Sequence, residues 1–193
     1  MTTWFTADTH FHHKNISRLA ERPWDDLTEM NERIIQRWNE SVRPDDDIWV
    51  LGDYVLGSKR ETLEITARLM GRKHLIVGNH DGPFDQRPAK AAEWLRLYLE
   101  HGFDSVHFGS VGYRLGDLPV LLSHFPYQAD ERHENKYIEH HPVDAGLPLI
   151  HGHVHGAWRQ RGRQYNVGVD VNDFRPLALE EVYDWVIADY TDF

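Results

Sequence analysis

Residues 2–10 read "TTWFTADTH", a short apolar run that leads into an aspartate and a histidine. The run predicts a first β-strand, with Asp8 and His10 at its carboxyl end. The same arrangement recurs in "IWVLGD" (48–53), a buried-type strand that ends at Asp53. In layered α/β folds the loops beyond the carboxyl ends of strands meet in one crevice, so this repetition predicts an α/β fold with a site at that edge.

Helices alternate with strands in the first half of the chain. Apolar residues at three- and four-residue spacing predict an amphipathic helix over residues 25–42, with Asp25 or Asp26 as its cap. A strand is predicted over residues 73–78. Further helices are predicted over residues 59–71, 87–102 and 177–190.

The second half reads as a run of short strands. Residues 104–126 break into three apolar segments separated by glycine and aspartate, which predicts an antiparallel meander. A strand within residues 147–156 leads into a glycine-rich loop, and another is predicted over 161–171. This order of elements favours a layered α/β sandwich. We expect one domain over residues 1–193, since this length builds a core large enough to fold unaided.

The composition excludes several classes of protein. The chain has no cysteine, which rules out disulfides, thiolate metal sites and thiol nucleophiles. The first residues lack the segments of a signal peptide, and no apolar run is long enough to span a bilayer, so we expect a soluble, cytoplasmic protein without a membrane partner. The net charge of −10 argues against passive binding of nucleic acid, but bound divalent cations would reverse the local field in a phosphate-handling enzyme.

Metal-type ligands gather at the predicted strand ends, and three of the motifs contain glycine: "GD", "GNHD" and "GHVH". Seven side chains are candidates: Asp8, His10, Asp53, Asn79, His124, His153 and His155. Carboxylates, imidazoles and an amide, without sulfur, suit Mn, Fe, Zn or Ni better than Ca or Mg. These ligands are too many for one tetrahedral ion but suffice for two divalent ions that share a bridging carboxylate. Two-metal sites of this kind are common in phosphoester hydrolysis.

These motifs carry a family resemblance. The ordered blocks "DTH", "GD", "GNHD", "SH" and "GHVH" resemble those of the calcineurin-like metallophosphoesterase superfamily. The segments "THFHHKNI", "MNERIIQRWNESV", "DDDIWVLGD" and "NVGVDVNDFRPLALEEV" are similar to a small bacterial and phage branch of single-domain phosphoesterases. The resemblance spans nearly the whole chain and implies an α/β fold of two mixed sheets flanked by helices, a layered α-β-β-α sandwich.

The resemblance also implies a role for each motif residue. One metal would be held by Asp8, His10 and His155. The other would be held by Asn79, His124 and His153. Asp53 would bridge the two ions, and a metal-bridging hydroxide would be the nucleophile. His80 would stabilise or protonate the leaving oxygen, with Asp81 orienting its imidazole. Manganese is the expected metal, with iron, zinc or nickel as alternatives.

The remaining polar residues near these motifs have weaker claims to a role. His13 is predicted to lie on the substrate side or behind the ligands, whereas His12 is not expected to be a ligand. His151 either plays a similar part or packs in the core, and Arg161 either meets a substrate phosphate or lies on a solvated hairpin tip. Six histidines are expected to play no part, the last three of them solvated: His74, His101, His107, His133, His140 and His141.

We therefore expect a dinuclear metal-dependent phosphoesterase. A phosphodiester in a nucleotide or at a nucleic-acid end is the favoured substrate, with phosphomonoesterase or protein phosphatase activity as alternatives. A non-catalytic metal-binding scaffold is a third possibility, disfavoured because the metal-binding acids and the "GNHD" histidine are all present. The physiological substrate and the oligomeric state do not follow from the sequence.

Overall fold

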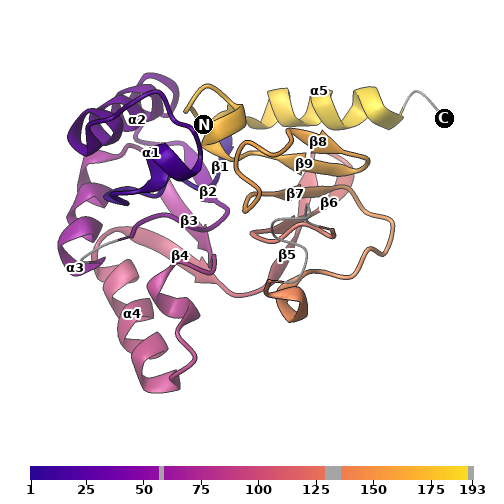
Figure 1. Ribbon diagram of the computed structural model, residues 1–193. Helices are drawn as coiled ribbons and strands as arrows, with labels where there is room; N and C mark the ends of the chain where they lie inside the picture. The colour runs from indigo at the N-terminus through magenta and orange to yellow at the C-terminus, as the bar shows by residue number, and fades with distance from the viewer. Residues whose placement is uncertain (57–58, 129–135, 191–193) are drawn as a thin grey trace.

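The computed structural model describes residues 1–56, 59–128 and 136–190. Its strands form two five-stranded sheets, and Figure 1 labels the strands from β1 to β9. The first sheet has the order β10-β1-β2-β3-β4, in which β1 to β4 run parallel and β10 pairs antiparallel with β1. Its strands are β1 (Thr3–Thr6), β2 (Asp47–Val50), β3 (Arg72–Ile76), β4 (Phe103–His107) and β10 (Leu177–Ala178).

The second sheet has the order β5-β6-β7-β9-β8. Its three central strands β6, β7 and β9 are parallel, and β5 and β8 pair antiparallel with their neighbours at the two edges. The strands are β5 (Ser110–Leu115), β6 (Leu118–Ser123), β7 (Leu149–His151), β8 (Gln160–Arg161) and β9 (Gln164–Asn166). Both sheets are therefore mixed.

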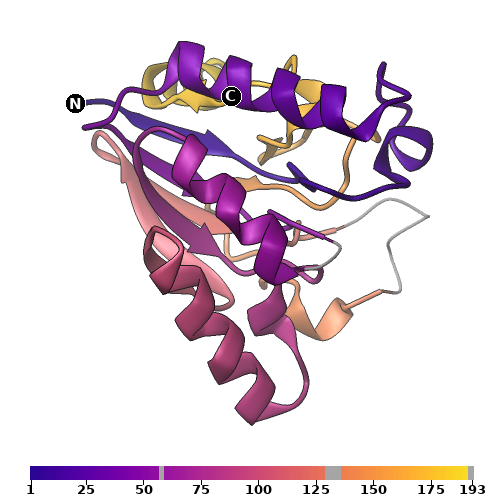
Figure 2. The ribbon, with the colours of Figure 1, turned by 90° about the vertical axis from the view of Figure 1, so that its left-hand side faces the viewer.

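Helices cover the outer face of the first sheet, and Figure 2 shows α2 and α4 lying across it. The α-helices are α1 (Ile16–Leu19), α2 (Leu27–Ser41), α3 (Lys59–Thr62), α4 (Pro88–Glu100) and α5 (Leu179–Tyr190). Short 3-10 helices are η1 (Leu63–Arg68), η2 (Gly82–Phe84), η3 (Ile138–His140) and η4 (Val169–Val171).

The helix α2 forms as its sequence predicts. Asp26 caps it, because its side chain accepts a hydrogen bond of 2.7 Å from the backbone N–H of Glu29. The apolar stripe buries Met30, Ile34 and Trp38 against the first sheet. Asp26 is thus the cap rather than Asp25.

Two apolar clusters hold the layers together. One lies between the helices and the outer face of the first sheet, and includes Trp38, Ile48 and Leu75. The other lies between the two sheets, where Phe5 and Leu122 pack together with Val182 of α5. Figure 1 shows α5 running beside β8 and β9. These two cores fix the carboxyl ends of β1, β2 and β3 against those of β6, β7 and β9.

Three predicted elements differ from the structure. The helix over 59–71 divides into α3 and the 3-10 helix η1. The first segment of the expected meander is β4, which joins the first sheet parallel to β3. The preceding helix α4 returns the chain to the start of the sheet, and such a crossover produces a parallel strand. The strand predicted over 161–171 is divided: Arg161 ends β8, Gln164–Asn166 form β9, and η4 follows.

The predicted fold class is confirmed: two mixed sheets with flanking helices. Among the described residues, every helix is too short or too polar to cross a membrane.

Candidate metal centre

The seven predicted ligands come from loops beyond the strand ends of both sheets. Three follow β1, β2 and β3 of the first sheet: Asp8, Asp53 and Asn79. Three follow β6 and β7 of the second: His124, His153 and His155. His10 completes the set from the loop after β1. The two sheets therefore supply opposite sides of one site.

The ligand atoms form two groups suited to metal ions. One group is Asp8, His10 and His155, and the other is Asp53, His124 and His153; in each, the ligand atoms lie within 4.8 Å of one another. Asp53 also faces the first group, because its Oδ2 is 3.5 Å from His10 Nε2 and 3.6 Å from His124 Nε2. One carboxylate oxygen thus lies between the two groups.

Asn79 joins the second group through His124. Its Oδ1 lies 3.1 Å from His124 Nε2, which is in turn 3.2 Å from His153 Nδ1. The structure therefore brings all seven predicted ligands together, while His12 lies in neither group and donates its backbone N–H to Asn31.

The backbone at the site has a strained conformation. Five of the seven ligands have positive φ angles: Asp8 (57°), His10 (47°), Asp53 (54°), His153 (73°) and His155 (47°). Aspartate and histidine enter this left-handed region more readily than most residues, at a cost of roughly 1–3 kcal/mol each. Strain of this kind concentrates at functional sites, where the surrounding structure holds it in place.

Two glycines make room for the carboxylates. A Cβ at Gly78 would lie 2.4 Å from Asp53 Oδ1, and one at Gly152 would lie 2.6 Å from Asp8 Oδ2. Real Cβ atoms do not approach other atoms so closely. The glycines of "GNHD" and "GHVH" are therefore part of the site, because they let a neighbouring loop pass against each acid.

Burial shapes the charge of the site. Burial raises the pKa of Asp8 to about 8, with Asp53 raising it and His155 lowering it. Burial also lowers the pKa of His10 and of His124, which keeps both imidazoles neutral at neutral pH. Neutral imidazoles can bind an ion directly, whereas Asp8 would release its proton when an ion binds.

The donor set fits divalent transition metals. Asp8 Oδ1 and His10 Nε2 are buried and make no hydrogen bond within the described parts of the chain. Leaving buried polar atoms unsatisfied is costly, and an ion between them would remove that cost. Mixed carboxylate and imidazole ligands match the preference of such ions.

Sequence reasoning missed Arg22 and Asp170, which lie directly behind the ligands. Asp170 Oδ2 accepts a hydrogen bond of 2.8 Å from His155 Nδ1. Arg22 Nε lies 2.7 Å from Asp170 Oδ1, and both side chains are buried. The segment "NVGVD" repeats the pattern of a strand followed by glycine and aspartate, which is a signal for Asp170. No comparable pattern points to Arg22.

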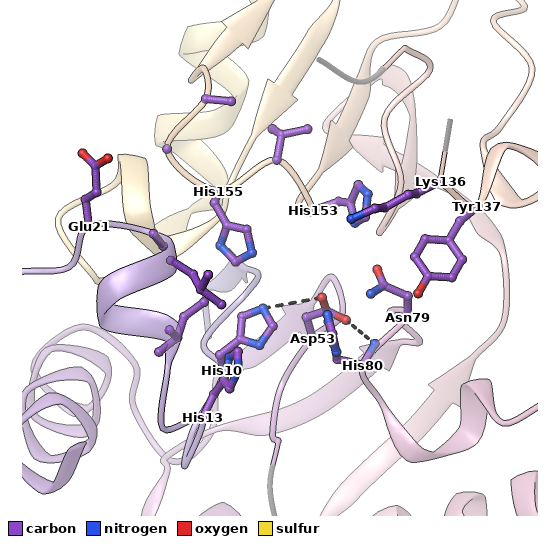
Figure 3. Close-up of a pocket in the computed structure, with 16 residues that line it drawn as sticks. His10, His13, Glu21, Asp53, Asn79, His80, Lys136, Tyr137, His153 and His155 are labelled. Carbon is purple, nitrogen blue, oxygen red and sulfur yellow. Dashed lines mark hydrogen bonds and ion pairs between the residues drawn. The ribbon is translucent and has the colours of Figure 1, made fainter. Parts of the chain in front are cut away.

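A cavity of about 930 Å³ opens onto the metal groups. Figure 3 shows His10, Asp53 and His155 facing it, with Glu21 at one side and Lys136 and Tyr137 at the other. One wall is apolar and consists of Ile16 and Leu19 of α1 and of Ala20, which follows the helix. Sequence reasoning gave no signal for Lys136 or Tyr137, because both lie in the polar stretch "DERHENKYIEHH" (130–141), outside every ligand motif.

His80 lines this cavity, and the recorded hydrogen bonds of the Asp81 carboxylate go to other residues. The ring centroids of His80 and His10 are 5.3 Å apart, and the backbone N–H of His80 donates to Asp53 Oδ1. The Asp81 carboxylate instead accepts four hydrogen bonds, from the backbone N–H groups of Gly78, Asp53 and Tyr54 and the hydroxyl of Tyr98. These hydrogen bonds give no support to the predicted orienting role, which stays a prediction. Asp81 ties the loop after β3 to the loop after β2.

The three weaker candidates have different outcomes. His13 lines the cavity, with its ring 5.4 Å from that of His10. His151 is buried, and its ring centroid lies 4.7 Å from that of Trp158. It does not line the cavity, so it packs as part of the core. Arg161 is exposed in β8, also away from the cavity, so its predicted contact with substrate is not supported.

Some histidines expected to be solvated or idle make tertiary contacts. The ring of His140 lies 5.8 Å from Phe125, and that of His141 lies 5.4 Å from the same residue. His74 bonds to Ser105 at 2.8 Å and lies 3.2 Å from Asp47. His107 bonds to the same Ser105 hydroxyl. His133 lies outside the described residues. None of the five described ones belongs to the two metal groups.

Such a fold and site define a class of α/β proteins that hold metal ions between two sheets. Comparison of the sequence places the chain more narrowly: it matches the calcineurin-like phosphoesterase model over residues 1–188 and belongs to that family. The family binds two divalent metal ions, and the two groups above are the residues of this chain that could hold them.

The chain is also similar to two phage proteins and to a solved structure. The Gene 66 proteins of mycobacteriophages L5 and D29 are similar to the chain, with 34% identity over 95% of this chain and 93% of the L5 protein, and 33% identity over 95% and 94% for D29. The crystal structure of the Aquifex aeolicus protein AQ665, described as being of unknown function, has a TM-score of 0.72 and 28% identity, covering 95% of this chain and 98% of that one.

Proposed function

We propose that this chain is a dinuclear metal-dependent phosphoesterase that prefers phosphodiesters. One observation carries the proposal: Asp53 Oδ2 lies between His10 of one metal group and His124 of the other. A shared carboxylate is the arrangement that two neighbouring ions need. The ions would lie at the floor of the cavity, where a phosphate group can reach them.

Each residue of the site would have a distinct role in the reaction. Two bound ions would supply Lewis acidity, which polarises the phosphoryl group and lowers the pKa of water. Asp53 would hold both ion positions at a fixed separation. The His80 imidazole faces the same cavity and would give a proton to the leaving oxygen. Asp81 and Gly78 support this geometry by fixing the loops after β2 and β3.

The cavity also favours a class of substrate. Its volume of about 930 Å³ exceeds that of phosphate alone, and sites of this size bury whole organic ligands. Lys136 supplies a cation at the rim, and the ring of Tyr137 stands beside it (Figure 3). The net charge of −10 disfavours a long polynucleotide. A nucleotide or the end of a nucleic acid fits these features, and manganese is the metal we propose.

A direct assay tests the proposal. The purified chain, loaded with Mn²⁺ and then with Fe²⁺, Zn²⁺ or Ni²⁺, is offered bis-p-nitrophenyl phosphate and p-nitrophenyl phosphate. We expect higher kcat/KM with Mn²⁺ and with the diester. A reversed preference would favour the monoesterase or protein phosphatase alternative. If neither compound is hydrolysed with any of the metals, the result would favour the alternative of a non-catalytic metal-binding scaffold. We propose a cytoplasmic location, which fractionation of the native cells would test.

A further inference from the structure

A buried ion pair lies behind one metal group. The side chains of Arg22 and Asp170 are 0% and 1% exposed, although the two residues are 148 positions apart. Arg22 Nε bonds to Asp170 Oδ1 at 2.7 Å, and Arg22 Nη2 bonds to Asp170 Oδ2 at 3.1 Å. Burying a charge pair is often no more stable than apolar packing, so stability alone is a weak reason for it.

The acid of this pair contacts a predicted ligand. Asp170 Oδ2 accepts a hydrogen bond of 2.8 Å from His155 Nδ1. A carboxylate cannot donate this bond, so the proton lies on Nδ1 of His155. When the imidazole is neutral, the lone pair is then on Nε2, the ring nitrogen that remains for the ion. Carboxylates in this position set the tautomer and orientation of histidine ligands.

The arginine of the pair contacts the loop that carries a second predicted ligand of the same group, Asp8. Arg22 Nη2 donates to the backbone carbonyl of Asp8 at 2.6 Å, and Nη1 donates to the carbonyl of Thr9 at 3.0 Å. Asp8 has a left-handed backbone with φ of 57°, a conformation that needs outside support. One guanidinium therefore braces the strained loop after β1 and the acid behind His155.

We propose that Arg22 and Asp170 are positioning residues: together they aim Asp8 and His155 at one ion position. Asp170 sets the tautomer of His155, and Arg22 holds Asp170 and the Asp8 backbone in register. The inference rests on the proposed function, since it assigns a purpose to the pair at that metal site.

Nitrogen NMR of the imidazole side chains tests the first part without any metal. In the metal-free wild type we expect His155 to be the Nδ1–H tautomer. The amide of Asp170→Asn has one acceptor oxygen, whereas the carboxylate uses both of its oxygens to accept hydrogen bonds from His155 and Arg22. We therefore expect a mixture of His155 tautomers in this variant. Mn²⁺ affinity, measured by calorimetry, should fall about 10- to 100-fold at one of two sites.

Arg22→Lys separates the two roles. The lysine keeps a positive charge but lacks the fork that reaches the carbonyls of Asp8 and Thr9. We expect His155 to remain the Nδ1–H tautomer while Mn²⁺ affinity falls. This variant also tests the positioning role if Asp170→Asn does not fold.

Asp46→Asn is the matched control. Asp46 is also a buried carboxylate with three hydrogen bonds, but it lies at the opposite ends of the strands. We expect it to lose stability and to keep Mn²⁺ affinity. Unchanged His155 tautomer in Asp170→Asn, or unchanged Mn²⁺ affinity in Arg22→Lys, would overturn the proposal. If these effects occur but the wild type hydrolyses no phosphoester, the proposed function fails and the positioning role stands.

Discussion

Gly152 leaves the space that the Asp8 carboxylate fills, since a Cβ at position 152 would lie 2.6 Å from Asp8 Oδ2 and 2.5 Å from the Cβ of Ala7. Gly152→Ala should therefore displace Asp8 and weaken one of two Mn²⁺ sites by at least about tenfold, as small shifts at metal ligands do. Calorimetric titration with Mn²⁺ measures both sites. Gly112→Ala is the control, because a Cβ there meets no atom within 4 Å, and it should bind Mn²⁺ as the wild type does. Two unaltered sites in Gly152→Ala would contradict the close contact.

Asp53 is predicted to serve both ions. Its Oδ2 lies within 3.6 Å of imidazole nitrogens from both groups, whereas Asp8 faces one group. Asp53→Asn should weaken both sites, because the amide replaces one charged oxygen with an N–H₂ donor. Asp8→Asn should weaken one. Metal content by mass spectrometry after dialysis distinguishes them, and loss of a single ion in both variants would refute a bridging role.

His80 is predicted to act on the leaving group. His80→Asn should lower kcat about 10²- to 10⁴-fold for an alkyl phosphodiester, whose leaving oxygen needs a proton. The loss should be smaller for a p-nitrophenyl ester, because p-nitrophenolate leaves without protonation. Bound Mn²⁺ should stay at the wild-type level. Equal losses on both esters would assign His80 another task, and an unaltered kcat would remove it from the mechanism.

Lys136 is predicted to bind substrate before and during reaction. Lys136→Met keeps the length of the side chain and removes the charge, so KM should rise about tenfold, the equivalent of one charged contact, while kcat changes little. Steady-state kinetics at low and high salt provide the measurement. A rise in KM that persists unchanged at high salt would argue against a contact between charges.

Asp46 is predicted to make the stability of the folded protein depend on pH in the acidic range. Burial alone would raise its pKa, but hydrogen bonds from the N–H groups of Thr2 and Arg43 and from the Trp4 indole outweigh it, so the pKa of Asp46 is lowered. A lowered pKa in the folded state stabilises the protein above the unfolded pKa of about 3.9, and this stability is lost as pH falls through the folded value.

Urea denaturation of Asp46→Asn checks this prediction. At pH 7 the variant should be about 1–3 kcal/mol less stable, because buried donors lose their acceptor. Between about pH 4 and pH 2 it should lose less stability than the wild type, since it lacks the titrating group. Parallel pH profiles for the two proteins would show that Asp46 is not the group responsible.

The strand ends show how far sequence reasoning reaches. Regular alternation along a strand would place Asp8, His10 and His12 on one face. The strand β1 ends at Thr6, however, and the left-handed angles of Asp8 and His10 follow it, so alternation no longer applies. Order and spacing of the motifs predicted which residues come together here, because the motifs record which residues meet and not the path between them.

Asp81 and His151 show what the motifs leave open. Asp81 stands within one ligand motif and His151 directly before another, yet Asp81 accepts hydrogen bonds from Gly78, Asp53, Tyr54 and Tyr98, and His151 packs on Trp158. The loop conformation decides which neighbours such side chains meet, and one motif does not encode it. Adjacency to a ligand therefore does not imply a part in the chemistry.

The sequence by itself determined the family, the two-sheet fold and the seven candidate ligands, because these depend on local periodicity and on ordered short motifs. Only the tertiary structure decided that Asp53 lies between the two ligand groups, that Arg22 meets Asp170, and that Lys136 stands at the cavity rim. Each of these contacts joins residues far apart in the chain. Packing of the two sheets brings them together, and no local pattern records that packing.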